Sequence, residues 1–227
     1  RDCLLSRGLG DVYKRQAEGR KALITFITAG DGGYDCTEKA VLEMAKNGAD
    51  LIELGVPFSD PIAEGPVIQC ASERSLRNGT TLVGIFDLVR RLRKETDVPL
   101  LLMMYLNTIF CFGTDRFFAL CEECGIDGVI VPDIPFEEKD EIQGSADAHN
   151  VHNISLVTPA SEDRIQMIAS EATGFLYCVS SNGVTGVRSQ FQTDFAPFFE
   201  KIHKYAKVPC AVGFGISGPE AAREMSQ

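Results

Sequence analysis

The sequence has few of the side chains that most often carry metal or imidazole chemistry. It contains three histidines and no tryptophan in 227 residues. His149, His152 and His203 are scattered and match no triad and no metal-ligand spacing. We therefore expect no metal site, and we expect any chemistry to rest on carboxylates, hydroxyls and backbone groups.

Basic residues are also scarce relative to acidic ones. The chain has 22 Lys and Arg against 32 Asp and Glu, a net charge of −10. Nucleic acids and anionic membrane surfaces require clustered basic residues, so the sequence excludes both as partners. A phosphorylated small molecule stays compatible, because backbone N–H groups at helix N-termini can bind phosphate without net positive charge.

Long apolar runs are absent as well. No stretch reaches the 18 residues that would predict a transmembrane helix. The first sixteen residues have neither a sustained apolar segment nor a small-residue cleavage site, so they do not predict a signal peptide. Hydrophobic residues nonetheless make up 44% of the chain, enough for a sizeable core.

The eight cysteines are too few for a dense disulfide framework. Four of them lie inside apolar stretches, where a free cysteine behaves as a small hydrophobe: Cys70, Cys111, Cys178 and Cys210. Cys121 and Cys124 form a CxxC pair without a second pair nearby, which favours a helix face over a zinc or redox site. This usage predicts a reducing, cytoplasmic location.

Short, β-branched apolar runs recur along the whole chain. They lie at 22–28, 50–54, 98–105, 127–133, 153–158, 174–180 and 208–215. Runs that are apolar throughout are typical of strands buried on both faces in a parallel sheet. Stretches with helical spacing separate them; in one, Val83, Phe86, Val89 and Leu92 are expected to form the buried face.

This alternation of strand and helix predicts an α/β fold. Repeated β/α units form either a doubly wound sheet or a (β/α)8 TIM barrel. No GxGxxG motif follows the first run, and the seven units stop within a helix that begins near Ser217. We therefore favour a barrel truncated to about seven units.

A glutamate interrupts the second apolar run, in "LIELGVPFSDPIAEGP" at 51–66. If Glu53 faces the barrel mouth, desolvation would raise its pKa toward neutrality, as a general acid or base requires. The alternative is a structural glutamate paired with a Lys or Arg. Buried carboxylates in strands are rare, so we favour the functional interpretation.

Two strand-to-helix connections, 55–66 and 180–191, are unusually long, and long loops in compact domains are usually functional. In the first loop, Asp60 fits an ordinary turn-forming role as well as it fits a functional one. Glu64 could supply a second carboxylate over the barrel mouth. The second loop offers the hydroxyl of Thr185. A later stretch, "GFGIS" at 213–217, could bind a phosphate through its N–H groups.

The stretch "LIELGVPFSDPIAEGPVIQCASERSLRNG" closely resembles the signature of the tryptophan synthase alpha chain family. Five further blocks follow the family order from about residue 18 to the end: "ALITFITAGD", "LLMMYLNTIFCFG", "DGVIVPDIPFEE", "YCVSSNGVTGVR" and "VGFGIS". The resemblance implies a TIM barrel that cleaves indole-3-glycerol phosphate to indole and glyceraldehyde 3-phosphate, a lyase reaction of tryptophan biosynthesis. It implies no cofactor in this chain, and a beta-chain partner that holds pyridoxal phosphate in an alpha2-beta2 heterotetramer.

The resemblance also assigns roles to residues. Glu53 matches the family's acid/base glutamate, and Glu64 matches the carboxylate that binds the indole N–H, a position where the family often has Asp. Asp60 and Asn107 match positions in the loop and on the surface that face the beta chain. The implied substrate-binding residues are Phe26, Met103, Ile130, Tyr177, Thr185, Gly186, Phe214 and Gly215.

Both ends depart from the family pattern. Residues 1–16 replace an amphipathic helix and resemble translated cloning sequence, so we place the barrel domain at 17–227. The eighth strand and its phosphate loop are absent, which would leave two unpaired sheet edges, poor solubility and little activity. A stand-alone indole-releasing lyase and a catalytically silent regulatory barrel are the alternatives to the alpha chain.

Overall fold

The structure is a computed structural model that describes residues 9, 18–179, 196–213, 216 and 218–225. Its strands are β1 (Ile24–Thr28), β2 (Leu51–Gly55), β3 (Leu100–Met103), β4 (Gly128–Ile130), β5 (His152–Asn153), β6 (Leu156–Val157), β7 (Leu176–Val179) and β8 (Cys210–Gly213). Its α-helices are α2 (Tyr34–Lys46), α3 (Pro66–Arg77), α4 (Leu82–Leu92), α5 (Leu106–Phe112), α6 (Thr114–Cys124), α7 (Asp140–Ala148), α8 (Ile165–Glu171), α9 (Ala196–Tyr205) and α10 (Pro219–Met225). Two 3₁₀ turns, η1 (Phe136–Glu138) and η2 (Pro159–Arg164), precede α7 and α8.

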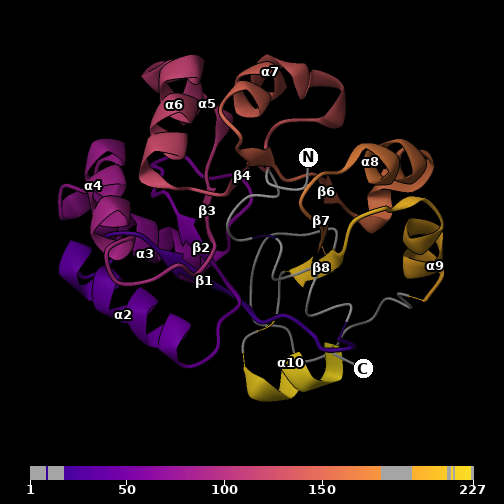
Figure 1. Cartoon of the computed structure of the whole chain (residues 1–227), viewed down its shortest axis with the longest axis horizontal. Coiled ribbons are helices and arrows are strands. Elements are labelled where there is room, and N and C mark those ends of the chain that lie inside the picture. The colour runs from indigo at the N-terminus through magenta and orange to yellow at the C-terminus, as the bar shows by residue number, and fades with distance from the viewer. Residues whose placement is uncertain (1–8, 10–17, 180–195, 214–215, 217, 226–227) are drawn as a thin grey trace.

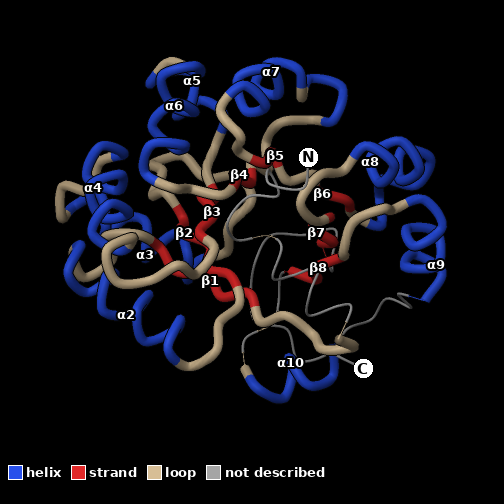
Figure 2. Tube along the Cα trace, viewed as in Figure 1, coloured by secondary structure: helices blue, strands red, loops and turns tan. Residues whose placement is uncertain are grey.

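The strands form an inner layer surrounded by helices (Figure 1). All pairings are parallel, in the orders β1-β2-β3-β4-β5 and β6-β7-β8. The predicted strand at 153–158 is divided between the two sheets. Its first half pairs with β4, where Ile154 N donates to Val129 O at 2.9 Å, and its second half accepts from Tyr177 N through Ser155 O at 3.0 Å. One extended segment therefore joins the two sheets, and the seven predicted units form one continuous arc (Figure 2).

Side chains alternate along each strand between the barrel interior and the helices. The outward residues of β2 to β4 pack against α2, α4, α6 and α7, and those of β6 to β8 pack against α8 and α9. The inward residues form a separate cluster of Leu51, Leu101, Ile130, Ile154, Phe175, Tyr177 and Val179, joined by Leu9. This parity fixes which strand residues can face a site inside the barrel.

Three expectations about helices and cysteines are wrong. Val83 is 54% exposed, because three-residue steps rotate by about 60° each around a helix and cannot keep four residues on one face. Cys70 and Cys111 are exposed rather than buried, since they lie on the outer faces of α3 and α5. Helices α3 and α5 were themselves not predicted, although Pro66 at the start of α3 and the Asn78-Gly79 pair after it are ordinary helix-end signals.

None of the helices in the described part of the chain is both long and apolar enough to cross a membrane.

Candidate active site

Glu53 lies in the middle of β2, with Phe26 of β1 on one side and Leu101 of β3 on the other. It has the same parity as Leu51, which belongs to the interior cluster, so it lies on the inner side of the barrel. The residue is only 3% exposed. Burial raises its pKa from the ordinary 4.5 to about 8, with desolvation as the sole cause.

No Lys or Arg among the described residues forms an ion pair with Glu53, so the structure does not support the alternative of a structural glutamate. The buried carboxylate that is paired is Asp127, whose Oδ2 lies 3.0 Å from Arg93 Nη2 and also accepts the N–H of Leu100. A buried acid that stays unpaired is held in its neutral form, which can donate a proton.

Tyr177 shares the barrel interior with Glu53. It is 7% exposed on β7, and its pKa is raised first by burial and then by the negative charge of Glu53. Its ring occupies the space beside Gly213, where an added Cβ would lie 2.1 Å from the hydroxyl oxygen. The glycine at the end of β8 is therefore required for the ring to lie where it does.

An apolar wall surrounds the two polar groups. Met103 and Ile130 are neighbours in register on β3 and β4 and belong to or pack against the interior cluster. Phe26 is 36% exposed, and its ring lies over Gly55, where an added Cβ would be 2.5 Å from Cζ. Two residues beyond Phe26, Thr28 is buried with a hydroxyl that has no partner among the described residues.

Glu64 lies in the loop between β2 and α3 and is held there by Tyr105. The Tyr105 hydroxyl donates to Glu64 Oε2 and accepts the N–H groups of Ile62 at 3.0 Å and Ala63 at 2.9 Å. Burial, followed by the bond to Glu64, raises the pKa of Tyr105 to about 12. Sequence reasoning assigned Tyr105 no role, although an aromatic residue ending the third apolar run at the barrel mouth was a usable signal.

The helix that follows Glu64 is fixed to the end of β1. Arg74 of α3 makes two hydrogen bonds to the carboxylate of Asp31, at 2.8 and 2.7 Å, and these lower the pKa of Asp31. Ser75 Oγ donates to Ala29 O at 2.6 Å. These contacts fix the position of α3, and with it the position of the end of the loop that carries Glu64.

The structure describes six of the ten predicted site residues. Five lie at the barrel interior and mouth, namely Glu53, Phe26, Met103, Ile130 and Tyr177, and the sixth, Glu64, lies on the adjoining loop. The remaining four, Thr185, Gly186, Phe214 and Gly215, lie outside the described residues. Asp60 is exposed and accepts a hydrogen bond from Ser59 Oγ at 2.5 Å, and Asn107 is exposed on α5.

No group of three or more His, Cys, Asp or Glu side chains in the described ranges is arranged to hold a metal ion. Cys121 and Cys124 are both buried free thiols on α6. Burial raises the pKa of each, which disfavours the thiolate that zinc binding or redox chemistry needs. The pair is part of the helix face that packs on the core.

Comparison with known proteins places these features in a family. The family model described as "Tryptophan synthase alpha chain" matches residues 12–227. The tryptophan synthase alpha chain of Clostridium kluyveri is 47% identical over 207 residues, which are 91% of this chain and 79% of that protein. That of Geobacter sp. strain M21 is 49% identical over 210 residues, 92% of this chain and 79% of that protein.

Solved structures agree. A protein from Aquifex aeolicus superposes with a TM-score of 0.88 at 37% identity, covering 97% of this chain and 85% of that one. A chain from the tryptophan synthase a2b2 complex of Pyrococcus furiosus superposes with a TM-score of 0.83 at 33% identity, covering 90% of this chain and 83% of that one. The predicted TIM-barrel fold is confirmed by this likeness.

Proposed function

The chain belongs to the tryptophan synthase alpha chain family, and on that premise we propose how its residues perform the reaction. The alpha reaction of tryptophan synthase is a carbon–carbon lyase reaction that cleaves indole-3-glycerol phosphate to indole and glyceraldehyde 3-phosphate. The observation that carries the proposal is Glu53, an acid that has no ion-pair partner among the residues described, is 3% exposed and has a pKa raised to about 8. It is therefore mostly protonated at neutral pH.

In the proposed mechanism, Glu53 moves one proton from the substrate's glycerol hydroxyl to its ring. The neutral carboxyl first donates its proton to the indole ring carbon that bears the side chain, which gives a cationic indolenine. The resulting carboxylate then removes the proton of the adjacent hydroxyl. The O–H electron pair forms the aldehyde C=O, the C–C bond breaks, and its electrons return to the ring, so Glu53 ends protonated as it began.

We propose that Glu64 accepts the indole N–H and stabilises the cationic intermediate. This assignment is supported by its position on the loop directly after β2 and by the hydrogen bond that holds one of its oxygens. A negative charge held beside a developing cation is stabilising only if it is fixed before the reaction, since no reorganisation is then needed. The departure from Asp to Glu keeps the charge and lengthens the reach.

The remaining proposed contacts divide into an indole pocket and a phosphate end. The flat, apolar ring would lie between Phe26, Met103, Ile130 and Tyr177, whose placement around the interior supports the proposal. Thr185, Gly186, Phe214 and Gly215 are proposed for the closing loop and the phosphate because the family match extends over them. Residues 17–227 are proposed to form one barrel domain.

The chain works with a tryptophan synthase beta chain. We propose that the contact surface lies at the barrel mouth, where Ile62 is 72% exposed, Val67 70% and Phe110 45%. The exposed side chain of Asp60 lies on the same loop after β2 as Ile62, and that of Asn107 lies on the same helix, α5, as Phe110. We propose further that pyridoxal phosphate belongs to the beta chain and that this chain supplies indole to it.

We also propose a cytoplasmic location, because the seven described cysteines are free thiols, as is usual in a reducing compartment. Cell fractionation tests this, and recovery in an oxidising compartment would contradict it.

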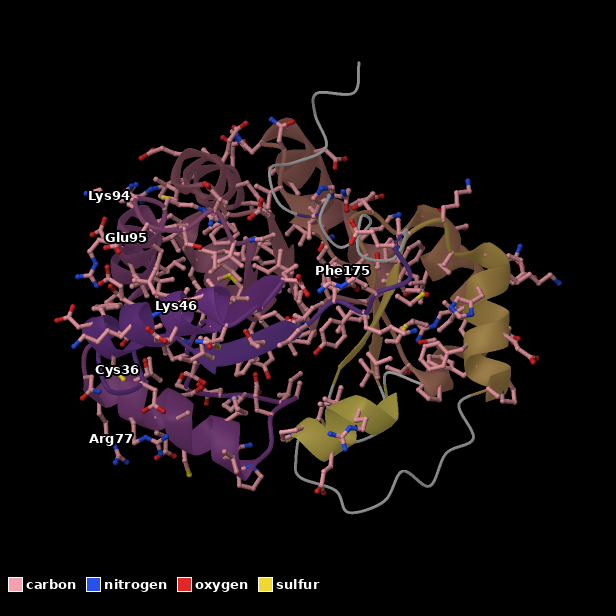
Figure 3. The ribbon with its side chains drawn as sticks, turned by 60° about the horizontal axis from the view of Figure 1, so that its bottom comes forward. Cys36, Lys46, Arg77, Lys94, Glu95 and Phe175 are labelled. Atoms are coloured by element: carbon pink, nitrogen blue, oxygen red, sulfur yellow. The ribbon has the colours of Figure 1, made fainter. Side chains whose placement is uncertain are left out.

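The decisive test compares Glu53→Gln with the parent protein. Loss of the acid is expected to lower the rate of indole release by about 10²-fold or more. Glu95→Gln is the matched control: Glu95 is exposed between α4 and β3, at the opposite end of the barrel, and Figure 3 shows it at the edge of the molecule, while Phe175 lies toward the middle. Near-parent activity of Glu53→Gln would refute the assignment.

The same assay separates the alternatives. High indole release without any beta chain would favour a stand-alone lyase, and no release under any condition would favour a silent barrel. The intact, buried acid of Glu53 favours catalysis over the silent barrel.

A further inference from the structure

Tyr105 lies at the point where β3 passes into α5, and its side chain is only 3% exposed. Its hydroxyl has three partners: it accepts from the N–H of Ile62 and of Ala63 and donates to Glu64 Oε2. A phenol oxygen has two acceptor positions and one proton, so these bonds use its full capacity. Because both acceptor positions are taken by backbone donors, the proton can go only to the carboxylate.

We propose that Tyr105 is the positioning residue for Glu64: by holding Oε2 it fixes where the other oxygen meets the indole N–H. This inference rests on the role proposed above for Glu64. Among the described residues Oε1 of Glu64 has no partner, so it is the oxygen left for the substrate. Within the described ranges, the protein thus bonds one carboxylate oxygen, Oε2, and leaves Oε1 for the substrate.

The tyrosine is itself well fixed, as a positioning residue must be. Its ring lies 5.0 Å from that of Phe58, at an interplanar angle of 33°. The next residue, Leu106, donates its backbone N–H to Asp133 Oδ1 at 2.9 Å, which holds the start of α5. With its pKa raised to about 12, Tyr105 keeps its proton at any pH at which the enzyme works, so it remains a donor.

Glutamate needs such a contact more than a shorter acid would. Its extra methylene adds a rotatable bond, and an unrestrained carboxylate would sample positions that miss the ring nitrogen. Misplacement of a reacting or stabilising group by about 1 Å can lower a rate by about 100-fold. The backbone of the loop is held by Gln69 Nε2, which donates to Glu64 O at 3.0 Å, but that bond does not fix the carboxylate.

The test is a double-mutant cycle in the full-length protein, with indole release as the readout. Tyr105→Phe alone is expected to lower kcat by about 10- to 100-fold with little change in KM, because Glu64 acts on the cationic intermediate. In the Glu64→Gln background the same change is expected to lower kcat by less than about 2-fold, since no carboxylate remains to be positioned. The control is Tyr34→Phe, which removes a hydroxyl bonded to the Thr81 backbone outside the site.

Equal losses from Tyr105→Phe with and without the Glu64 carboxylate would overturn the proposal, because they would mean that the hydroxyl only shapes the loop. Near-parent kcat of Tyr105→Phe would overturn it too. If Glu64→Gln itself kept near-parent kcat, the proposed function of Glu64 would fail instead, so the two failures are distinguishable.

Thermal melting guards against a trivial loss of fold. If Tyr105→Phe melts well below the parent, all four proteins of the cycle are assayed at a temperature below the melting transition of the least stable one. The loss in kcat from Tyr105→Phe is still expected to depend on the Glu64 carboxylate, and equal losses in both backgrounds would overturn the proposal.

Discussion

At the scale of single residues, two buried carboxyl groups in this barrel have opposite environments. Asp127, 7% exposed, is paired with Arg93 and accepts the Leu100 N–H. Glu53, 3% exposed, forms no ion pair with a cation in the part of the chain that the structure describes, and burial alone raises its pKa to about 8. The first arrangement holds the ends of strands together, whereas the second preserves an acid. Burial is common to both, and the presence of a partner decides between them.

The raised pKa of Glu53 predicts that folding stability declines with pH. The folded carboxyl binds its proton up to about pH 8, while the unfolded one loses it near 4.5, so stability is fully present below 4.5 and is lost as pH rises through 8. At about 1.4 kcal/mol per pKa unit, the decline over the whole shift is of order 5 kcal/mol. Urea titrations of the parent and Glu53→Gln at pH 5 and pH 8.5 measure it; an equal slope in both proteins would contradict the account.

The sequence predicted the burial and the raised pKa of one residue, whose side chain broke a pattern, while its catalytic role stays a prediction. Glu53 stood out because a charged residue lay in an apolar run. Tyr105 did not stand out, since a tyrosine at the end of an apolar run fits the run. Its proposed role depends on hydrogen bonds with a loop about forty residues away. The burial of Cys70 and Cys111 was predicted wrongly because apolar neighbours in sequence lie on other helix faces.

At the scale of elements, the site is made where strands end. The glycines Gly55 and Gly213 terminate β2 and β8, and each leaves room for an aromatic ring from a neighbouring strand, Phe26 and Tyr177. The strand runs were predicted from sequence, with the exception that the fifth divides between two sheets. The packing of the aromatic rings over the glycines was not predicted from the sequence, because it depends on the register between strands, which only the folded sheet defines.

Gly55→Ala is expected to disturb the site more than the fold. The new methyl group would lie 2.5 Å from Cζ of Phe26, so the ring must move. Because Phe26 is 36% exposed, its ring can swing away, and the expected loss of stability is only about 1 kcal/mol, while kcat/KM for indole release falls by about 10-fold. Gly144→Ala, in α7 with open space around it, is the control. An unchanged kcat/KM in Gly55→Ala would show that Phe26 has no part in the pocket.

At the scale of the whole molecule, the described strands form an arc whose outermost members, β1 and β8, are each paired on one side only. The alternation of runs predicted this architecture, and the family resemblance predicted the partner. The apolar part of the proposed partner surface could not be predicted from the sequence, because Ile62, Val67 and Phe110 resemble core residues until the fold shows them exposed.

Ile62→Asp is expected to weaken association with the beta chain by about 10-fold or more, because it places a charge in an apolar contact. Calorimetric titration of the beta chain into the variant measures this. Val83→Asp is the control, since Val83 is also exposed but lies on α4. Equal affinities for parent and Ile62→Asp would place the interface elsewhere.

The central claim, that the barrel keeps Glu53 as a neutral acid, is tested most directly by titrating that carboxyl. Nuclear magnetic resonance of protein labelled with ¹³C at glutamate side-chain carboxyls follows each group with pH, and Glu53→Gln identifies the Glu53 signal by its loss. The account predicts a midpoint near pH 8. A midpoint near the ordinary 4.5 would contradict it.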